Sequence, residues 1–326
     1  MRAIEIAEYG GPEVLRIAER PRPSIAVDEV LIGVEAAGLS RADTVQRQGK
    51  YPPPPGITDI LGMDCAGEIV EVGAGVRDWQ VGDRVCALVA GGGYSEYCAA
   101  PAVQVLPIPN GWTAVEAVTL PENMFTVYDM LVLRLRLGLG ETALIHGGTS
   151  GIGITAVMLA RALGAIPFAT AGSDEKCRAC MSFGAAGAIN YKTQDFVEQI
   201  KAATNGRGVD VILDMVGGDY LSRNLDALAV EGRIGHLSSG SATAELDLRK
   251  LMAKRAALFG SGMRVRTPAE KGKIAAALLK HVWPLLPARH PIRPIVDSTF
   301  PLEQATQAHA RMETSEHIGK IVLTTK

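Results

Sequence analysis

The chain has 326 residues and a formal net charge of −2, with 33 Lys+Arg against 35 Asp+Glu. It therefore lacks the basic excess that holds a nucleic-acid backbone or an anionic membrane surface. The 36 glycines and the 5% aromatic residues are typical of a turn-rich α/β protein rather than a helical bundle. The length corresponds to about two domains, each able to bury its own core.

Targeting signals and disulfides are not expected. Glu5 and Glu8 interrupt the stretch where a secretory signal needs an unbroken apolar run. No window approaches the roughly 18 uncharged apolar residues of a spanning helix. Five cysteines are too few for a disulfide scaffold in a chain of this length. These features predict a soluble protein of a reducing compartment, the cytoplasm.

The first third of the chain is predicted to be rich in β-structure. Short β-branched segments punctuated by glycine occur at 29–39, 66–76 and 82–90. The sequence YPPPPG at 51–56 forms neither helix nor central strand, because successive prolines fix φ and remove amide donors. This segment is therefore expected to be an ordered loop or a lid.

Strands and helices are predicted to alternate after about residue 122. The strand-like runs lie at 141–148, 166–172, 185–190, 208–216, 231–239 and 256–262. Helix-length segments separate the first five of these runs, which predicts an α/β fold with a doubly wound parallel sheet. A last helix is expected at 268–286, and a C-terminal strand at 317–325 is expected to rejoin the first domain.

A glycine-rich turn, HGGTSGIG at 146–153, lies between a predicted strand and a predicted helix. Its glycines permit a tight turn and bring backbone amides close to a pyrophosphate at the helix N-terminus. A glycine string alone is weak evidence, but this one is followed by further α/β units. The turn predicts a dinucleotide site with three residues at the pyrophosphate: Ser150, Gly151 and Ile152.

The tip of the second strand favours NADP over NAD. An NAD site usually offers an acidic residue here for the ribose 2′-hydroxyl. Here the tip instead offers small residues, a hydroxyl and a lysine, and a tyrosine ends the third strand. These residues suit a 2′-phosphate: Gly172, Ser173, Lys176 and Tyr191. Asp174 is the acidic residue that keeps NAD open, because its side chain could turn inward.

Further cofactor contacts are expected where the later strands end. In an open α/β sheet, ligands bind outside the carboxyl ends of the strands, at the switch point of the strand order. The residues at these ends are Val216, Gly217, Ser238, Ser239, Gly240, Phe259 and Ser261.

The spacing of the glycines also fits the short-chain dehydrogenases. They need a Tyr-x-x-x-Lys pair, in which the lysine lowers the tyrosine pKa for acid–base work. Tyr128, Tyr191 and Tyr220 have no lysine four residues later, and about 145 residues precede the turn. This class is therefore excluded.

Two histidines are interpreted as non-catalytic. His146 ends the first strand of the parallel sheet, where a catalytic histidine is conceivable. The resemblance described in the next paragraph implies that it is a structural wall residue instead. His309 lies in a segment without any catalytic constellation and is expected at the surface.

Longer strings along the whole chain resemble the medium-chain dehydrogenase/reductase superfamily, with its GroES-like first domain and its Rossmann domain. The strings are GGPEVL (10–15), RADTVQRQGKYPPPPG (41–56), ILGMDCAGEIVEVGAGV (60–76), GDRV (82–85), GGGYSEY (91–97), HGGTSGIG (146–153), TAGS (170–173), FGAAGAINYK (183–192), ILDMVGG (212–218) and HIGKIVL (317–323). They resemble the zinc-independent NADPH:quinone oxidoreductases of the zeta-crystallin type. The loop Arg-Gln-Gly-x-Tyr-x-Pro-Pro-Pro-Gly is similar to that of the stress-inducible quinone oxidoreductase branch.

The resemblance implies a discontinuous first domain. A GroES-like catalytic domain is expected from 1–122 and 291–326, with the Rossmann NADP-binding domain at 123–290. A symmetric homodimer is expected by analogy, because the last strand of the parallel sheet leaves an open edge that pairing would cover.

The residues at the zinc positions of the superfamily predict no metal. Zinc alcohol dehydrogenases have a cysteine where this chain has Ser40, and a His-Glu pair where it has Met63 and Asp64. Serine and methionine are poor Zn²⁺ ligands compared with thiolate and imidazole. The region of the structural zinc lobe holds only Cys86 and Cys98 instead of four close cysteines.

Without a Lewis acid, alcohol oxidation is disfavoured and an electrophilic acceptor is expected. A quinone takes hydride directly from the nicotinamide, so the protein mainly orients donor and acceptor in an interdomain cleft. The resemblance implies that Tyr51 lines this cleft as the catalytic residue; packing on the prolines is the alternative. It further implies cofactor contacts from Ser40, Asp43, Thr126 and Lys320, although the family usually has asparagine at position 40.

Three functions follow from the sequence. The first is an NADPH-dependent quinone reductase. The second is an NADPH-dependent enoyl or alkenal reductase, which acts on an activated C=C bond with the same fold and cofactor. The third is a weakly catalytic NADPH-binding protein with a structural or RNA-binding role, which the net charge does not support. The expected partner is a small-molecule quinone or activated alkene, with no membrane and no specific nucleic acid.

Overall fold

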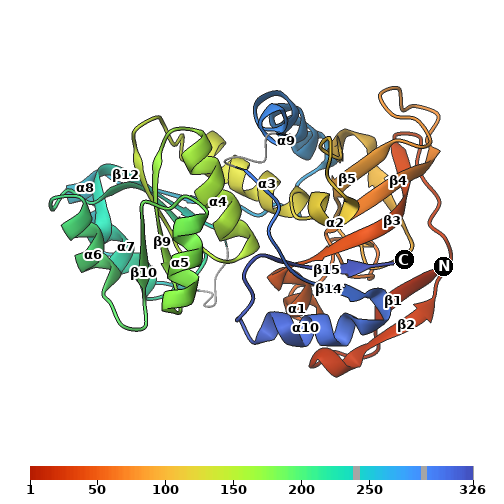
Figure 1. The fold of residues 1–326 in the computed structure, drawn as a ribbon, viewed down its shortest axis with the longest axis horizontal. Helices are drawn as coiled ribbons and strands as arrows, with labels where there is room; N and C mark the ends of the chain where they lie inside the picture. Colours follow the sequence, from red (N-terminus) through yellow and green to blue (C-terminus); the bar gives the residue numbers. More distant parts are fainter. Residues whose placement is uncertain (238–242, 288–291, 326) are drawn as a thin grey trace. The chain divides into compact units, whose positions relative to one another are not determined.

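The computed structural model describes residues 1–237, 243–287 and 292–325. Over these residues the chain divides into two compact units (Figure 1). Unit 1 comprises Met1–Phe125, Met263–Arg289 and Arg293–Lys326, and unit 2 comprises Thr126–Gly262 and 290–292. The segment 263–289 thus groups with unit 1, whereas the boundaries predicted from the sequence assign it to the nucleotide domain. Those domain boundaries stay a prediction.

Unit 1 is built on a seven-stranded sheet in the order β14-β15-β3-β4-β5-β7, with β6 paired to β3. Its strands are β3 (Glu29–Leu39), β4 (Asp64–Val72), β5 (Arg84–Leu88), β6 (Tyr97–Pro101), β7 (Val105–Pro107), β14 (Val296–Pro301) and β15 (Lys320–Thr324). A separate antiparallel hairpin is formed by β1 (Arg2–Ile6) and β2 (Leu15–Glu19).

Two strand predictions can be compared directly with unit 1. The predicted strand at 29–39 is β3 with the same bounds. The predicted C-terminal strand at 317–325 is observed as β15, which pairs antiparallel with β3 so that Ile321 faces Leu39. The chain therefore returns to the sheet of unit 1 at its C-terminal end.

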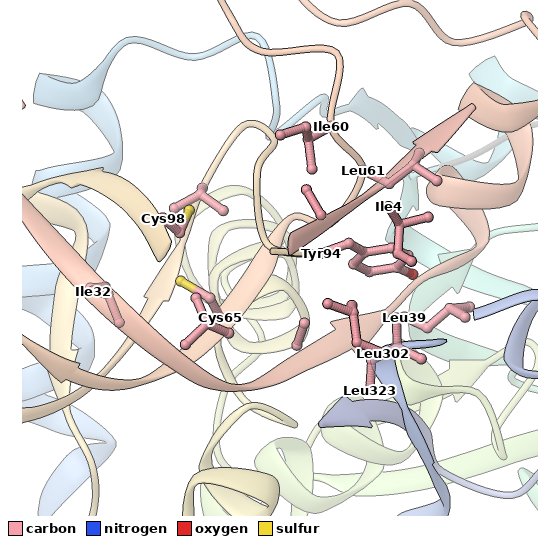
Figure 2. Close-up of a cluster of buried hydrophobic side chains, with 14 of the residues drawn as sticks. Ile4, Ile32, Leu39, Ile60, Leu61, Cys65, Tyr94, Cys98, Leu302 and Leu323 are labelled. Atoms are coloured by element: carbon pink, nitrogen blue, oxygen red, sulfur yellow. The ribbon is translucent and has the colours of Figure 1, made fainter. Parts of the chain in front are cut away.

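The core of unit 1 lies between this sheet and the segments that cover it. Leu39, Cys65, Tyr94, Leu302 and Leu323 are buried side chains from distant parts of the sequence that converge in one cluster (Figure 2). The helices of unit 1 are α1 (Arg41–Arg47), α2 (Ala114–Ala117), α9 (Pro268–His281) and α10 (Ala305–Glu313), and α3 (Pro121–Val127) leads into unit 2. Short helical turns occur at η1 (Pro12–Val14), η2 (Ala102–Gln104), η4 (Trp283–Leu285) and η5 (Leu302–Gln304).

Unit 2 contains a six-stranded parallel sheet in the order β10-β9-β8-β11-β12-β13. The strands are β8 (Thr142–Ile145), β9 (Ile166–Ala171), β10 (Gly187–Asn190), β11 (Val209–Asp214), β12 (Leu228–His236) and β13 (Ala257–Gly260). Counted along the chain, this order is 3-2-1-4-5-6, the doubly wound order of dinucleotide-binding sheets. The strand order reverses between β8 and β11, so the carboxyl ends of these two strands form the switch point.

Helices connect the strands of unit 2. They are α4 (Gly151–Ala162), α5 (Asp174–Ser182), α6 (Phe196–Ala203), α7 (Tyr220–Ala227) and α8 (Leu248–Lys254), preceded by the π-helical segment η3 (Tyr128–Arg134). Phe196 and Ile200 of α6 and Leu225 of α7 are fully buried and pack against Leu144 and Ile212 of the sheet. In the part of the chain that the structure describes, no helix combines the length and the apolar character needed to cross a membrane.

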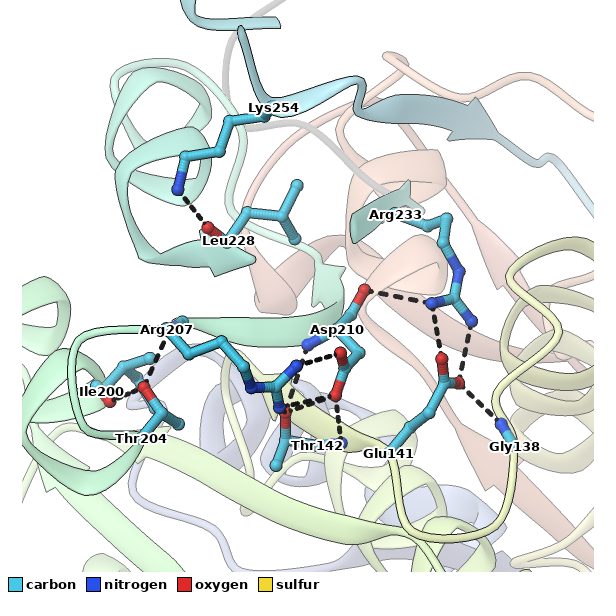
Figure 3. Close-up of polar contacts among 11 residues, drawn as sticks. Gly138, Glu141, Thr142, Ile200, Thr204, Arg207, Asp210, Leu228, Arg233 and Lys254 are labelled. Atoms are coloured by element: carbon cyan, nitrogen blue, oxygen red, sulfur yellow. Dashed lines mark hydrogen bonds and ion pairs between the residues drawn. The ribbon is translucent and has the colours of Figure 1, made fainter. Parts of the chain in front are cut away.

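A polar network holds the amino ends of the central strands together (Figure 3). Thr142 opens β8, and its backbone N and hydroxyl both donate to Oδ2 of Asp210 on β11, at 2.8 Å each. Arg207 donates to the same carboxylate at 2.9 Å. Next to it, Arg233 of β12 forms a two-nitrogen pair with Glu141, at 2.8 Å for each nitrogen. Because this edge is opposite the carboxyl ends, the network stabilises the sheet and leaves the switch point free for ligands.

Candidate active site

The glycine-rich turn connects β8 to α4 as the sequence predicts. Ser150 is the N-cap of α4, and its hydroxyl accepts a hydrogen bond of 3.0 Å from the backbone N of Gly153. A Cβ atom on Gly153 would lie 2.2 Å from the carbonyl oxygen of Gly147, so only glycine permits this close approach. The other amides at the start of α4, a helix of 12 residues, can bind an anion. The turn therefore fits a pyrophosphate at Ser150, Gly151 and Ile152.

The turn after β11 lies next to the glycine-rich turn. The side chain of Asp214 accepts hydrogen bonds from the backbone N of Val216 and of Gly217, at 2.8 and 3.1 Å. The Sδ atom of Met215 lies 3.5 Å from Oγ of Ser150. The structure thus brings the predicted residues after β8 and after β11 together at the switch point.

The residues predicted for the adenosine phosphate cluster at the tip of β9. A Cβ atom on Gly172 would lie 2.7 Å from the hydroxyl of Tyr191, which follows β10. Ser173 caps α5 by accepting a hydrogen bond of 3.2 Å from the backbone N of Lys176. The carboxylate of Asp174, the residue that kept NAD open, accepts a hydrogen bond of 2.7 Å from the side chain of Asn190. This hydrogen bond holds Asp174 against the end of β10.

A second lysine that the sequence reasoning missed lies at the same tip. The Cε atom of Lys192 would be 3.6 Å from a Cβ atom on Gly172, and its side chain is exposed. The only signal for it in the sequence is its place directly after Tyr191. Lys176 and Lys192 together give this tip two cations, which suits a phosphate group better than a ribose hydroxyl.

The structure says less about the other residues of unit 2 that the sequence predicts to contact the cofactor. Ser261, after β13, donates from its hydroxyl to Oδ2 of Asp129 at 2.7 Å, and Phe259 lies within β13. The hydroxyl of Thr126 in α3 is buried without a hydrogen-bond partner among the described residues. Ser238, Ser239 and Gly240 lie outside the described residues. Cofactor contacts from this group stay predictions.

The sequence-based expectations for His146 and His309 have different outcomes. His146 is fully buried, and its ring nitrogens lie 2.8 Å from Oδ1 of Asn224 and 3.1 Å from the hydroxyl of Thr170, as expected for a structural wall residue. Burial lowers the pKa of His146, which favours the neutral ring. The surface prediction for His309 is wrong. Its side chain is fully buried on α10, with Nδ1 3.2 Å from Nη1 of Arg47.

In unit 1, Ser40 and Asp43 form the start of α1. Oδ2 of Asp43 accepts hydrogen bonds from the backbone N and the hydroxyl of Ser40, at 2.8 and 3.1 Å. Oδ1 accepts from the backbone N of Gly62 at 3.2 Å. Burial raises the pKa of Asp43, while the hydrogen bonds from Ser40 and the charge of Lys320 oppose this rise. Both residues are buried, and their hydrogen bonds cap α1 and join its start to Gly62.

Lys320 lies in a buried cluster of acidic side chains that the sequence did not predict. Its Nζ atom lies 2.6 Å from Oδ2 of Asp64 and 3.7 Å from Oε2 of Glu122. Burial raises the pKa of Asp64 and raises that of Glu122 to about 7, against the attraction of Lys320. Burial also acts to lower the pKa of Lys320, but the two carboxylates overcome it, and the pKa is raised.

Tyr51, the predicted catalytic residue, lies on the loop after α1 and is half-buried. The guanidinium of Arg264 lies over its ring, 5.1 Å from the centroid. Burial raises the pKa of Tyr51, the charge of Arg264 lowers it, and Glu122 and Asp43 raise it further. Tyr51 is therefore within electrostatic reach of a cation and of the acidic cluster. Arg264 belongs to no motif and was not predicted.

The side chains at the zinc positions do not fit a zinc ion. The hydroxyl of Ser40 donates to Asp43, and Asp64 is paired with Lys320. Met63 supplies only a thioether, a poor ligand for Zn²⁺. Within residues 1–237, 243–287 and 292–325, no three His, Cys, Asp or Glu side chains are grouped so that they could hold a metal ion.

Comparisons with known proteins show which family the chain resembles. Residues 26–110 match the alcohol dehydrogenase GroES-like domain, and residues 151–280 match the zinc-binding dehydrogenase family. Quinone oxidoreductase from Rattus norvegicus is 32% identical over 329 residues, covering 99% of this chain and 97% of that protein.

Two solved structures are similar over nearly their whole length. Escherichia coli quinone oxidoreductase complexed with NADPH has a TM-score of 0.85 and 28% identity, covering 99% of this chain and 100% of that one. The CurK enoyl reductase has a TM-score of 0.87 and 29% identity, covering 99% and 98%. The chain therefore belongs to the medium-chain dehydrogenase/reductase superfamily of oxidoreductases, in which quinone oxidoreductases are its relatives over the full length.

Proposed function

We propose that this protein is an NADPH-dependent quinone reductase that works without a metal. The observation that carries the proposal is the dinucleotide turn at the switch point of unit 2, in a chain whose relatives over the full length are quinone oxidoreductases. The turn supplies a redox cofactor site, and the unsuitable zinc positions favour an acceptor that is already electrophilic.

The cofactor is NADPH. Ser150, Gly151 and Ile152 bind the pyrophosphate through the start of α4. Lys176 and Lys192 lie at the tip of β9 and pair with the 2′-phosphate, beside the hydroxyl of Tyr191. The hydrogen bond between Asp174 and Asn190 keeps a carboxylate from competing for this position.

Bound NADPH supplies a hydride from the nicotinamide C4. Tyr51 lines the acceptor site, and its hydroxyl donates a hydrogen bond to an acceptor oxygen. Its raised pKa keeps the hydroxyl protonated at neutral pH, which a hydrogen-bond donor requires. The cluster of Lys320, Asp64 and Glu122 holds β15 and α3 to β4, the strand that follows the loop of Tyr51.

The proposal is tested by following NADPH oxidation with a panel of quinones in stopped-flow experiments. Turnover with 1,4-quinones is expected, and a Tyr51→Phe variant is expected to lose activity with them while its NADPH affinity is unchanged. Failure of the wild-type protein to oxidise NADPH with any quinone would contradict the proposal.

An NADPH-dependent enoyl or alkenal reductase is the second candidate. It is supported by the similarity to the CurK enoyl reductase. An enoyl thioester and an alkenal, tested beside the quinones, separate the two functions. A kcat/KM for the thioester far above that for every quinone would favour the second candidate.

Metal independence has its own test. Metal analysis of protein purified without chelators should find less than one zinc ion per chain, and added chelator should leave activity unchanged. One tightly bound zinc per chain would overturn this part of the proposal. The location in the cytoplasm also stays a proposal, supported by five free thiols.

The protein is further proposed to be a homodimer. β13 is the terminal strand of the six-stranded sheet, and pairing with the same strand of a second copy would cover its edge. Light scattering of the purified protein should give twice the chain mass. A monomer at micromolar concentration would refute the dimer.

A further inference from the structure

Arg264 carries a guanidinium that the protein only partly satisfies. Its side chain is 5% exposed. Nε donates to the carbonyl oxygen of Ala90 at 2.8 Å, and Nη1 donates to that of Tyr51 at 3.4 Å. Nη2 is buried without a hydrogen-bond partner among the described residues. A buried donor without a partner is costly, above all on a charged group.

The acidic groups near Arg264 do not neutralise it. Burial lowers its pKa, and Tyr51 and Asp43 are the groups whose charges would raise it. The carboxylate of Asp43 already accepts hydrogen bonds from Ser40 and Gly62. Tyr51 stays protonated, because burial raises its pKa. The charge of Arg264 therefore lacks a dedicated counter-ion in the described part of unit 1.

A structural role accounts for only two of the nitrogen donors of Arg264. The bonds from Nε and Nη1 tie the loops of Ala90 and Tyr51 to the segment before α9. Nη2 makes no hydrogen bond to the described residues, so the structural role leaves this donor unused. A guanidinium offers such a donor in a fixed direction, which suits binding a carbonyl or an oxyanion.

We infer that Nη2 of Arg264 binds the oxygen of the electron acceptor that becomes negative during reduction, beside the ring of Tyr51. This inference rests on the proposed function and names the residue that recognises the acceptor. The acceptor gains a hydride, with its two electrons, from NADPH, which is oxidised to NADP⁺. Negative charge then builds on the acceptor oxygen, and a proton from water completes the product. Arg264 stabilises that charge, so acceptors with a conjugated carbonyl are selected.

Three variants test this role: Arg264→Gln, Arg264→Lys and, as a control, Arg77→Gln. Arg77 is an exposed arginine of unit 1 that bonds only neighbouring backbone carbonyls among the described residues. With 1,4-benzoquinone, Arg264→Gln should lower kcat/KM by about tenfold to a hundredfold, since a charged hydrogen bond is lost. Arg264→Lys should retain part of the rate, because it keeps the charge. The NADPH affinity, measured by fluorescence, should stay within about twofold in all three variants.

A second readout separates recognition from loop support. 4-Nitrophenol, whose anion is yellow, resembles the product oxyanion and should bind the NADP⁺ complex as the anion. Its apparent pKa when bound should be lower in the wild type than in Arg264→Gln, with Arg264→Lys close to the wild type. A purely structural arginine would not move this pKa.

The outcomes are distinguishable. A wild-type protein that reduces no quinone overturns the proposed function, while the nitrophenol titration still tests Arg264. Quinone turnover that survives Arg264→Gln within about twofold overturns the inference alone, as does an unchanged nitrophenol pKa. If Arg264→Gln does not fold, Arg264→Lys decides. A kcat/KM of Arg264→Lys equal to that of the wild type would then count against the inference, because a lysine keeps the charge but not the fixed direction of the Nη2 donor.

Discussion

The ammonium of Lys320 lies 2.6 Å from a carboxylate oxygen of Asp64, and both side chains are almost completely buried. Lys320 is the first residue of β15 and Asp64 is the first residue of β4, so the pair joins segments from opposite ends of the chain. Asp64 also accepts a hydrogen bond of 2.6 Å from the backbone N of Glu122. The pair therefore ties the returning C-terminal strand to the start of α3.

Lys320→Met is expected to destabilise the protein by about 3–5 kcal/mol, because it leaves a buried carboxylate without its cation. Urea unfolding followed by circular dichroism measures this change. The double variant Lys320→Met/Asp64→Asn should recover part of the loss. Arg84→Gln, which breaks the more exposed pair with Glu35, is the control and should cost less than about 1 kcal/mol. A Lys320→Met variant as stable as this control would contradict the prediction.

Glu122 is expected to make stability depend on pH. Its pKa is raised from 4.5 to about 7, mainly by burial, so the folded protein binds this proton more tightly than the unfolded chain. The contribution is therefore fully present below about pH 4.5 and is lost as the pH rises through about 7. The free energy of unfolding of the wild type, relative to Glu122→Gln, should fall by about 2 kcal/mol between about pH 5 and pH 8.

The same measurement with Glu8→Gln is the control for removing a carboxylate, because Glu8 lies at the surface of unit 1. This surface change is expected to alter the free energy of unfolding by less than about 0.5 kcal/mol. A difference between the wild type and Glu122→Gln that does not change with pH would contradict the prediction for Glu122.

Lys176→Ala is expected to weaken NADPH by about tenfold to a hundredfold and NADH by less than about threefold, because only NADPH carries the 2′-phosphate. Isothermal titration of both nucleotides measures this. Lys192→Ala should show the same selectivity with a smaller loss, since its side chain is exposed. Lys201→Ala, an exposed lysine of α6, serves as the control. Equal losses for the two nucleotides would show that Lys176 does not contact the 2′-phosphate.

Gly153→Ala is expected to abolish nucleotide binding and to cost about 1–3 kcal/mol of stability. The new methyl group would lie 2.2 Å from the carbonyl oxygen of Gly147, so the turn must open. Gly138→Ala is the matched control, because a methyl group there would contact only the side chain of Glu141, at 3.6 Å or more. Thermal shift with and without NADPH reports both effects. A Gly153→Ala variant that still shows the NADPH-dependent shift would refute this use of the turn.

Local sequence rules were sufficient to predict much of the fold of this protein. The strand at 29–39 and the turn at 146–153 were predictable because β-branched runs, glycine turns and helix caps act over a few neighbouring residues. The same rules located Gly172, Ser173 and Lys176 at the end of β9. The sequence strings spread along the chain indicated the superfamily, and the full-length relatives confirm that the chain belongs to it.

Other features depended on contacts between distant segments. The sequence could not show that Lys320 meets Asp64 and Glu122, that His309 is buried against Arg47, or that Arg264 covers Tyr51. A single charged or aromatic residue carries no periodicity, and its partner is chosen by sheet register and loop packing. By itself the sequence determined the fold class and the nucleotide turn, because both follow from local pattern. Only the tertiary structure decided which buried charges are paired and which donor of Arg264 has no hydrogen-bond partner among the described residues, because burial and pairing are properties of the folded chain.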